Sequence, residues 1–284
     1  MSLQINTNID ALTAYRNLSV TQGQMSQSLE RLSSGYRINR AADDAAGLAI
    51  SQGLASQVGG IKVAVRNAQD GINVVQTADG ALTETQSILQ RMRDLAVQSA
   101  NDSNDTNSRA DIQKEVDALA SELDRIASKT TFNNVNLLDG TFSGKQFQVG
   151  YASGDTIGVT IDNGTAGAGF SSADLAVQGA TAGTGIDMTT QTAATSAITA
   201  IDSAIQNVST SRAGLGALQN RLQHTINNLN VAQTNLSASM SSITDTDMAS
   251  EMVNFTRTQI LSQAGTAMLA QANQAPQSVL KLLQ

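Results

Sequence analysis

Two adjacent aspartates, Asp43 and Asp44, combine residue types and spacing that could carry chemistry. Paired carboxylates can act as general acid and general base, or can bind a cation. They can also cap a helix, because a carboxylate accepts hydrogen bonds from the unpaired N–H groups of the first turn. No other ligand lies nearby in the sequence, so we interpret one of the two as the cap of the helix that follows.

The single histidine, His224, is the next candidate, because imidazole is the usual general base near neutral pH. It lies between Leu222 and Ile226 but off their apolar stripe, so we expect it to face solvent. One histidine cannot form the two-histidine zinc motif of metalloproteases, and a chain without cysteine has no thiol nucleophile. We therefore expect no catalytic base at this position.

Glycine-rich and acidic loops also fail to complete a binding motif. Residues 144–146 read Gly-Lys-Gln and form no phosphate-binding loop, while the glycine pairs at 167–169 and 214–216 lack the third glycine of a dinucleotide motif. The stretch from Asp102 lacks the sixth-position glycine and the twelfth-position glutamate of a calcium loop. The sequence predicts no catalytic residue, no cofactor and no metal, and hence no enzyme.

The composition instead favours long, closely packed helices. Hydrophobic residues make up 40% of the 284 residues but aromatics only 3%, with no tryptophan and a single proline. Broad globular cores usually hold more aromatic rings. The net charge of −7 has no block of like charges, which argues against nucleic-acid binding, and no run reaches the ~18 apolar residues of a membrane span. The first residues lack the basic start and apolar core of a Sec-type signal peptide.

The strongest pattern is a heptad repeat in the C-terminal half of the chain. Apolar residues recur every seven positions at Ile201, Val208, Leu215, Leu222, Leu229, Leu236 and Ile243. Such residues form one stripe on an α-helix, and the stripe stays aligned only when the helix supercoils with a partner. The repeat therefore predicts a long coiled helix.

A second heptad repeat precedes it and predicts the partner. Its seam residues are Val58, Ile61, Val65, Ile72, Val75, Leu82 and Leu89. A second stripe, through Ile88 and Met92, indicates that this helix packs against partners on two sides. Gly71 and Gly80 each cost ~1 kcal/mol in a helix interior relative to alanine. They therefore suggest close approach by a neighbour, with a helix break as the alternative.

Shorter elements follow the second repeat. After the polar turn at 101–109, residues 112–126 carry a helical stripe and predict a helix that folds back antiparallel. The period then changes to two on either side of a turn at 152–155, which predicts a β-hairpin over about 141–162. Residues 163–196 are rich in Gly, Ala, Ser and Thr without a sustained period, and we expect an exposed loop.

Both ends of the chain are amphipathic segments with few charges. Their apolar residues at helical spacing include Ile5, Ile9, Leu12, Leu18, Met25, Leu29 and Leu32 at the start, and Met252, Phe255, Leu261, Met268 and Leu282 at the end. Neither segment can bury its stripe against itself, so each needs a partner in the chain or in another copy.

The fold class predicted by these patterns is mainly α. We expect a long antiparallel coiled-coil or helical-bundle rod with one β-hairpin region, and paired N- and C-terminal helices. Apolar ends of this kind would order when copies pack together. Contacts that do not close would build a helical filament, and contacts that close would build a coiled-coil oligomer. The residues alone leave both assemblies open.

Several blocks of the chain resemble bacterial flagellin. They are INTNIDAL, LERLSSGYRINRAADDAAGLAIS at 29–51, NAQDGINVVQTADGALTE at 67–84, LQRMRDLAVQSAN at 89–101, RLQHTINNLN at 221–230 and ILSQAGTAMLAQANQAPQSVLKLL at 260–283. The resemblance covers roughly residues 1–162 and 197–284. It implies a subunit that self-assembles into the flagellar filament, the extracellular propeller for swimming.

The resemblance also implies a division of labour along the chain. Residues 1–42 and 244–284 would form the filament core, and residues 43–162 and 197–243 a surrounding rod domain. Residues 163–196 would be a short variable surface loop in place of larger outer domains.

Further expectations from the resemblance concern partners. They are many copies of the chain itself, a flagellar export chaperone on the C-terminal segment, and the filament cap and hook-associated proteins. Export would run through the flagellar type III apparatus without a cleaved signal peptide. A vertebrate innate immune receptor would contact Arg91, Leu95 and Glu115, which match the recognised motif of the family.

Other proteins share parts of this pattern. A hook–filament junction protein has similar ends, but we expect it to match these blocks less closely. A signalling coiled coil would also show long heptads, usually beside a membrane span. These remain the alternatives to a filament subunit.

Overall fold

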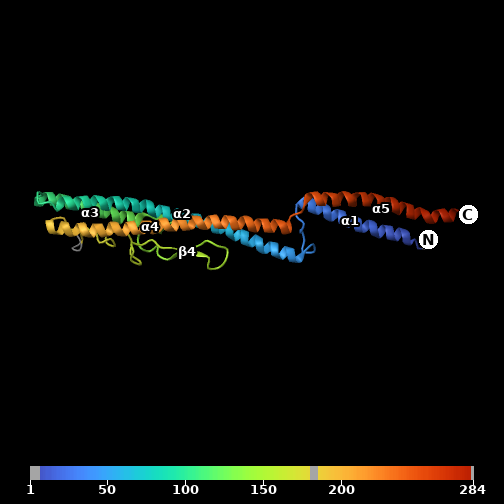
Figure 1. The fold of residues 1–284 in the computed structure, drawn as a ribbon, viewed down its shortest axis with the longest axis horizontal. Helices are drawn as coiled ribbons and strands as arrows, with labels where there is room; N and C mark the ends of the chain where they lie inside the picture. Colours follow the sequence, from blue (N-terminus) through green and yellow to red (C-terminus); the bar gives the residue numbers. More distant parts are fainter. Residues whose placement is uncertain (1–6, 180–184, 283–284) are drawn as a thin grey trace. The chain divides into compact units, whose positions relative to one another are not determined.

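The computed structural model describes residues 7–179 and 185–282, with side chains described through residue 274. Its helices are α1 (Ile9–Ser34), α2 (Ala45–Ser99), α3 (Thr106–Lys129), α4 (Gln191–Thr244) and α5 (Met248–Leu282) (Figure 1). The chain forms two compact units, one of Met1–Val58 with Thr234–Gln284 and one of Gly59–Gln233. Within the described ranges, no helix is long and apolar enough to span a membrane.

The ends of α1 follow from its flanking residues. The Asn8 side chain accepts a hydrogen bond from the Ala11 N–H at 3.0 Å, which satisfies one free donor of the first turn. At the other end Gly35 adopts φ 77°, and its N–H donates to the Arg31 carbonyl at 2.8 Å. Glycine fits this left-handed position because it has no Cβ.

The interpretation of the paired aspartates as a helix cap is confirmed for Asp44. Its Oδ1 accepts a hydrogen bond from the Gly47 N–H at 2.9 Å, directly before α2 begins. Asp43 closes the preceding turn instead, because it accepts from the N–H groups of Arg40 at 3.0 Å and Asn39 at 3.1 Å. These hydrogen bonds hold the pKa of the Asp43 carboxyl below its usual range.

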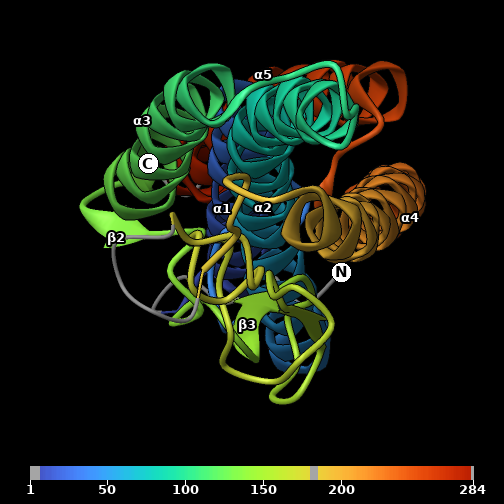
Figure 2. The same cartoon turned by 90° about the vertical axis from the view of Figure 1, so that its left-hand side faces the viewer.

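The core of the unit Gly59–Gln233 lies between α2, α3 and α4, which Figure 2 shows nearly end-on, with α3 and α4 on different sides of α2. The two long helices run antiparallel, since Arg93 pairs with Asp202 while Asp79, nearer the start of α2, pairs with Arg212. The predicted seam is buried at Ile61, Ile72, Val75, Leu82, Leu89, Ile201, Val208, Leu215 and Leu222, and half-buried at Val65 and Leu229. The predicted coiled pair is confirmed.

The second stripe of α2 packs against α3, as predicted. Met92 and Leu95 are buried in the same core as Val116 and Leu123 of α3. The fold-back is antiparallel, because the Arg109 side chain near the start of α3 donates to the Ser99 carbonyl at the end of α2, at 3.0 Å.

Gly71 and Gly80 differ in their surroundings. A Cβ on Gly71 would lie 3.3 Å from Leu222 Cδ1 and 3.4 Å from Phe147 Cδ1, so the predicted close approach is confirmed there. A Cβ on Gly80 would meet nothing within 4 Å, so the same prediction is wrong at Gly80. α2 continues through both positions without a break.

The predicted hairpin is formed by β3 (Lys145–Gln148) and β4 (Thr156–Val159), antiparallel with Phe147 opposite Ile157. A smaller antiparallel pair, β1 (Thr131–Phe132) and β2 (Val135–Asn136), was not predicted. Strands of two residues are too short to show a period. Their turn residues Asn133 and Asn134 have φ of 48° and 63°, a conformation that asparagine tolerates and that two-residue hairpin turns require.

The expectation of an exposed loop at 163–196 is wrong for part of that stretch. Apolar side chains of its described part are buried against the core of the unit, among them Phe170, Leu175, Val177, Ile186 and Met188. The Asp124 carboxylate of α3 fixes the segment, since it accepts from the Ser172 N–H at 2.7 Å and the Ser172 hydroxyl at 3.0 Å. Isolated anchors of this kind have no periodic signature in the sequence. α4 already begins at Gln191.

Candidate functional site

The paired terminal helices α1 and α5 form the most unusual surface of the molecule. They pack antiparallel, because Asn8 near the start of α1 donates to the Ala272 carbonyl late in α5 at 2.7 Å, while Arg31 reaches Glu251 near the start of α5 at 3.7 Å. The predicted pairing of N- and C-terminal helices is therefore confirmed.

The seam between these two helices is lined mostly by small or polar residues at alternating spacings of three and four. The buried and half-buried positions are Ala11, Ala14, Leu18, Thr21, Met25, Ser28 and Leu32 on α1, with Glu30 and Arg31 also half-buried, and Glu251, Phe255, Thr258, Ser262, Gly265, Leu269 and Ala272 on α5. Small side chains allow a close approach of the two backbones. A Cβ on Gly265 would lie only 3.2 Å from Leu18 Cδ1.

Apart from Leu18, Met25, Leu32, Phe255 and Leu269, the described large apolar side chains of these two helices lie outside the seam. They include Ile9, Leu12, Tyr15, Val20 and Leu29 on α1, and Met248, Met252, Val253, Ile260, Leu261 and Met268 on α5; each is between 48% and 68% exposed. Exposed apolar side chains gathered on a pair of helices in this way are typical of interaction sites in soluble proteins. We call these side chains the outer faces of α1 and α5.

The outer faces are also grooved. One groove follows α5 and is lined by Met252, Val253, Ile260 and Leu261 together with Ala249, Thr256 and Arg257. Another lies between the two helices, where Leu18, Leu261 and Met268 are among its lining residues. These grooves offer apolar side chains of a partner a place to insert.

The predicted filament-core residues divide into two groups in the structure. Ile9, Leu12, Leu29, Met252, Leu261 and Met268 lie on the outer faces, whereas Leu18, Met25, Leu32 and Phe255 are half-buried. Ile5 and the side chain of Leu282 lie outside the described residues. A helical period identifies all of these residues, but it does not say which stripe faces α5 or α1 and which remains open.

Polar groups fix how α1 and α5 meet. Glu251 is only 8% exposed and forms an ion pair with Arg31, and Ser28 and Thr258 are also buried along the same seam. Where α1 ends and α5 begins, the Arg37 N–H donates to the Thr244 carbonyl at 2.7 Å, and the Thr246 N–H donates to the Gly35 carbonyl at 2.9 Å. Directional contacts of this kind specify one register, which a seam of small residues specifies weakly.

The three residues that match the receptor motif are only partly brought together. Arg91 of α2 donates to Glu115 Oε1 of α3 through Nε at 2.9 Å and Nη2 at 2.7 Å, and both side chains are exposed. Leu95 is 2% exposed and belongs to the core between these helices. In this conformation a partner can contact the ion pair but not the Leu95 side chain.

Arg212 explains a polar residue at a core-type position of the heptad repeat. Its Nε donates to Asp79 Oδ1 at 2.8 Å and its Nη1 to Gln86 Oε1 at 2.7 Å, so α2 supplies partners for the charge. The partners of Arg212 could not be predicted from the sequence, because they lie on a helix more than a hundred positions away.

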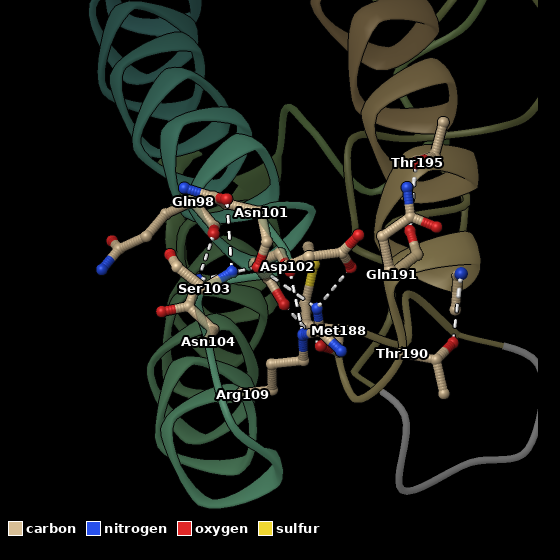
Figure 3. A network of polar contacts seen from close by, with 12 residues as sticks. Gln98, Asn101, Asp102, Ser103, Asn104, Arg109, Met188, Thr190, Gln191 and Thr195 are labelled. Atoms are coloured by element: carbon tan, nitrogen blue, oxygen red, sulfur yellow. Dashed lines mark hydrogen bonds and ion pairs between the residues drawn. The ribbon is translucent and has the colours of Figure 1, made fainter.

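The polar turn between α2 and α3 forms a network rather than a metal site (Figure 3). The Ser99 hydroxyl donates to the Met188 carbonyl at 2.6 Å, and Arg109 Nη2 donates to the Asn101 carbonyl at 3.2 Å. Gln113 accepts from the Met188 N–H at 2.6 Å. The network ties Met188, in the segment before α4, to the end of α2 and to α3, and it uses polar side chains to satisfy backbone groups.

Chemistry other than association finds no support in the described parts of the chain. His224 is exposed on α4, as expected. Across residues 7–179 and 185–282, no group of three or more His, Cys, Asp or Glu side chains could hold a metal ion. The arrangement offers apolar faces and helical seams, which are the means of assembly.

Comparisons with known proteins agree with that reading. Residues 5–143 match the model of the bacterial flagellin N-terminal helical region, and residues 198–283 match that of the C-terminal helical region. The chain is 50% identical over 280 residues to a flagellin of Halalkalibacterium halodurans, covering 98% of this chain and 99% of the relative. It is 46% identical over 305 residues to a flagellin of Bacillus subtilis, covering 99% and 100%.

A solved structure of a putative flagellar hook-associated protein from Vibrio parahaemolyticus shares the fold, with a TM-score of 0.57 over 72% of this chain and all of that chain. Its sequence identity of 14% supports a common fold and nothing more specific.

Proposed function

This chain belongs to the bacterial flagellin family, and on that premise we propose that the outer faces of α1 and α5 form the contacts between neighbouring copies in the filament. Flagellins are structural, non-enzymatic subunits that self-assemble into the extracellular flagellar filament and serve motility. The proposal concerns which residues of this chain do the assembling.

The observation that carries the proposal is the inverted burial of the terminal helices. Small side chains such as Ala11, Ala14 and Gly265 occupy much of the contact between α1 and α5, while eleven large side chains with exposures of 48% or more remain on the outer faces. Covering apolar surface yields about 25 cal/mol per Å², so many such side chains per copy supply a large driving force for association. A second copy of the chain presents the same kind of face.

The geometry of the pair suits an open assembly. Ile9, Leu12 and Leu29 lie on one helix, and Met252, Leu261 and Met268 on the other, so apolar surface is presented by both partners of the pair. A subunit with exposed apolar surface on more than one side can bind a neighbour on each side, and head-to-tail contacts that do not close into a ring produce a helical filament.

A division of labour follows from this placement. We propose that residues 1–42 and 244–284 form the filament core and that residues 43–162 and 197–243 form the surrounding helical domain. The short segment 163–196 takes the place of larger surface domains. The support is that most of the exposed large apolar side chains, eleven in the described residues, lie on α1 and α5, whereas α2, α3 and α4 share a closed core of their own.

Seeded polymerisation of the full chain tests the assembly surface. Leu12→Asp and Leu261→Asp would place a carboxylate in an apolar contact, which is costly without a partner. We expect filament elongation, followed by light scattering and negative-stain electron microscopy, to slow at least tenfold.

The matched control is Thr192→Asp, which adds the same charge at an exposed position in the first turn of α4. It should elongate like the parent chain, and circular dichroism should show full helix content for all three variants. Normal elongation of both leucine variants would refute the proposed surface.

Before assembly the same apolar faces need protection. We propose that an export chaperone covers α5, because Met252, Val253 and Ile260 expose apolar surface along one side of that helix. Removing residues 248–284 should abolish co-purification of the chaperone; retention of the chaperone would contradict this role. The filament cap and hook-associated proteins are proposed to meet the same ends of the chain.

We further propose that the Arg91–Glu115 ion pair is the part of the receptor motif that a vertebrate innate receptor contacts in the folded subunit. Both side chains are exposed and reach from neighbouring helices. Arg91→Ala should lower receptor signalling by purified subunit, while Arg125→Ala, which removes a comparable exposed ion pair with Glu122, should not. Equal signalling by both variants would contradict the proposal.

A further inference from the structure

The methionines of this chain range from fully buried to largely exposed. The sequence has eight methionines and no cysteine or tryptophan. Met248, Met252 and Met268 of α5 are each about half or more exposed, whereas Met92 and Met188 have 0% exposure. Of the seven methionines whose side chains are described, the three exposed ones all lie on α5, and Met25 and Met240 are half-buried.

We propose that Met248, Met252 and Met268 are oxidation sites through which peroxide-class oxidants control whether a free subunit can join a filament. The inference rests on the proposed assembly surface, because oxidation matters only if these side chains enter subunit contacts.

The absence of cysteine makes the thioethers the first targets. Thiolates normally react fastest with two-electron oxidants, and none is present to compete. Hydrogen peroxide transfers one oxygen atom to the thioether sulfur, which is oxidised by two electrons to the sulfoxide, and the peroxide is reduced to one molecule of water. No further reactant is needed, and the backbone stays intact.

The product conflicts with the environment that assembly would impose. Met252 lines a groove with Val253, Ile260 and Leu261, and Met268 lines the groove between α1 and α5 with Leu18 and Leu261. A sulfoxide carries a strong hydrogen-bond acceptor in place of an apolar sulfur. When such a group is buried without a donor its desolvation is uncompensated.

The state of assembly then decides sensitivity. In the free subunit the three thioethers are open to solvent, as the structure shows. In a filament built through the outer faces the same sulfur atoms would be covered, while Met92 and Met188 are protected in both states. Oxidants would therefore act on subunits awaiting incorporation and spare filament already formed.

Peroxide treatment of the purified full-length subunit tests the inference. Peptide-resolved mass spectrometry should find sulfoxide at Met248, Met252 and Met268 and not at Met92 or Met188. Seeded elongation of the treated chain should fall at least tenfold, and methionine sulfoxide reductases with dithiothreitol should restore it. Pre-formed filaments given the same treatment should carry little sulfoxide at the three α5 sites.

Replacement of the three α5 methionines by leucine separates these sites from general damage. Leucine has a similar volume and cannot be oxidised by peroxide, and Met-to-Leu changes are usually tolerated. The triple variant should elongate equally well before and after treatment. A matched variant with leucine at Met92, Met188 and Met240 should remain as sensitive as the parent chain; melting curves establish that both are folded.

Each result decides one question. Undiminished elongation of the oxidised parent chain, or equal loss in the α5 triple variant, would overturn the oxidation inference. Normal elongation of Leu12→Asp and Leu261→Asp would overturn the assembly surface instead. If those two variants fail to elongate while oxidised parent chain elongates normally, only the oxidation inference falls.

Discussion

The two units of this chain use the same kind of helix in opposite ways. In the unit Gly59–Gln233, large aliphatic side chains such as Leu82, Leu89 and Val208 are fully buried between α2, α3 and α4. In the pair of α1 and α5, alanine, serine, threonine and glycine occupy much of the seam beside a few larger residues such as Leu18 and Met25, and eleven large apolar side chains lie outside it. A heptad pattern thus indicates that a helix packs against a partner, and the position of its large residues indicates which side of the helix that partner covers.

The difference is that the unit Gly59–Gln233 buries its core within one copy, whereas we propose that the pair of α1 and α5 buries most of its apolar surface only against other copies. Burial of a leucine contributes about 1.5–3 kcal/mol relative to exposure, so a seam rich in small residues gives the α1–α5 pair little stability of its own. On the proposed assembly surface, the apolar side chains outside the seam serve association instead.

The largest expected effect contrasts a leucine of each unit. Leu82→Ala should lower the free energy of unfolding of the α2–α3–α4 core by about 2–5 kcal/mol, because it leaves a cavity among fully buried neighbours. Ile260→Ala on the outer face of α5 should change the stability of the free subunit by less than about 0.5 kcal/mol.

Hydrogen exchange of α2 and α5 peptides, combined with denaturant unfolding, measures both values. A loss of stability at Ile260 comparable to that at Leu82 would mean that the outer face is already packed in the free subunit. It would break the comparison.

A smaller effect comes from two glycines that meet a leucine across their seams. Gly71→Ala should destabilise the core by about 1 kcal/mol, since its Cβ would press on Leu222, which is fully buried and backed by Phe147. Gly265→Ala presses on Leu18, which is half-buried beside an open groove and can move. There the gain in helix propensity, up to about 1 kcal/mol, should dominate.

Thermal unfolding of the two variants, together with hydrogen exchange in α2 and α5, shows whether each substitution raises or lowers stability. Destabilisation by Gly265→Ala as large as that by Gly71→Ala would show that the α1–α5 seam is packed as rigidly as the core. The comparison between the units would then rest on residue size alone.

Some features of the fold could be predicted because their cause is local. Asp44 caps α2 through a hydrogen bond to a residue three positions ahead, and the β3–β4 hairpin pairs residues around a short turn. The seam residues from Ile61 to Leu89 and from Ile201 to Leu222 are buried because a strict period places them on one stripe. Each of these needs only spacing and residue type.

Other features depend on contacts that no spacing reveals. Arg212 is accommodated in a seam because Asp79 and Gln86 lie opposite it, and the segment with Phe170 packs into the α2–α3–α4 core, where Asp124 of α3 accepts hydrogen bonds from Ser172. Gly71 and Gly80 look alike in the sequence, yet only the first faces a neighbour. Long-range pairing selects between outcomes that are locally equivalent.

The sequence by itself determined that the chain is helical, that its long helices have coiled partners and that its blocks match the flagellin pattern. Those conclusions rest on the periods of the α-helix and on residue identity, which are properties of the chain. Only the tertiary structure decided which residues of α1 and α5 face the other helix and which stay exposed to solvent. A helix with apolar residues on two sides can turn either of them inward, and the choice is made by the shape of the helix packed against it.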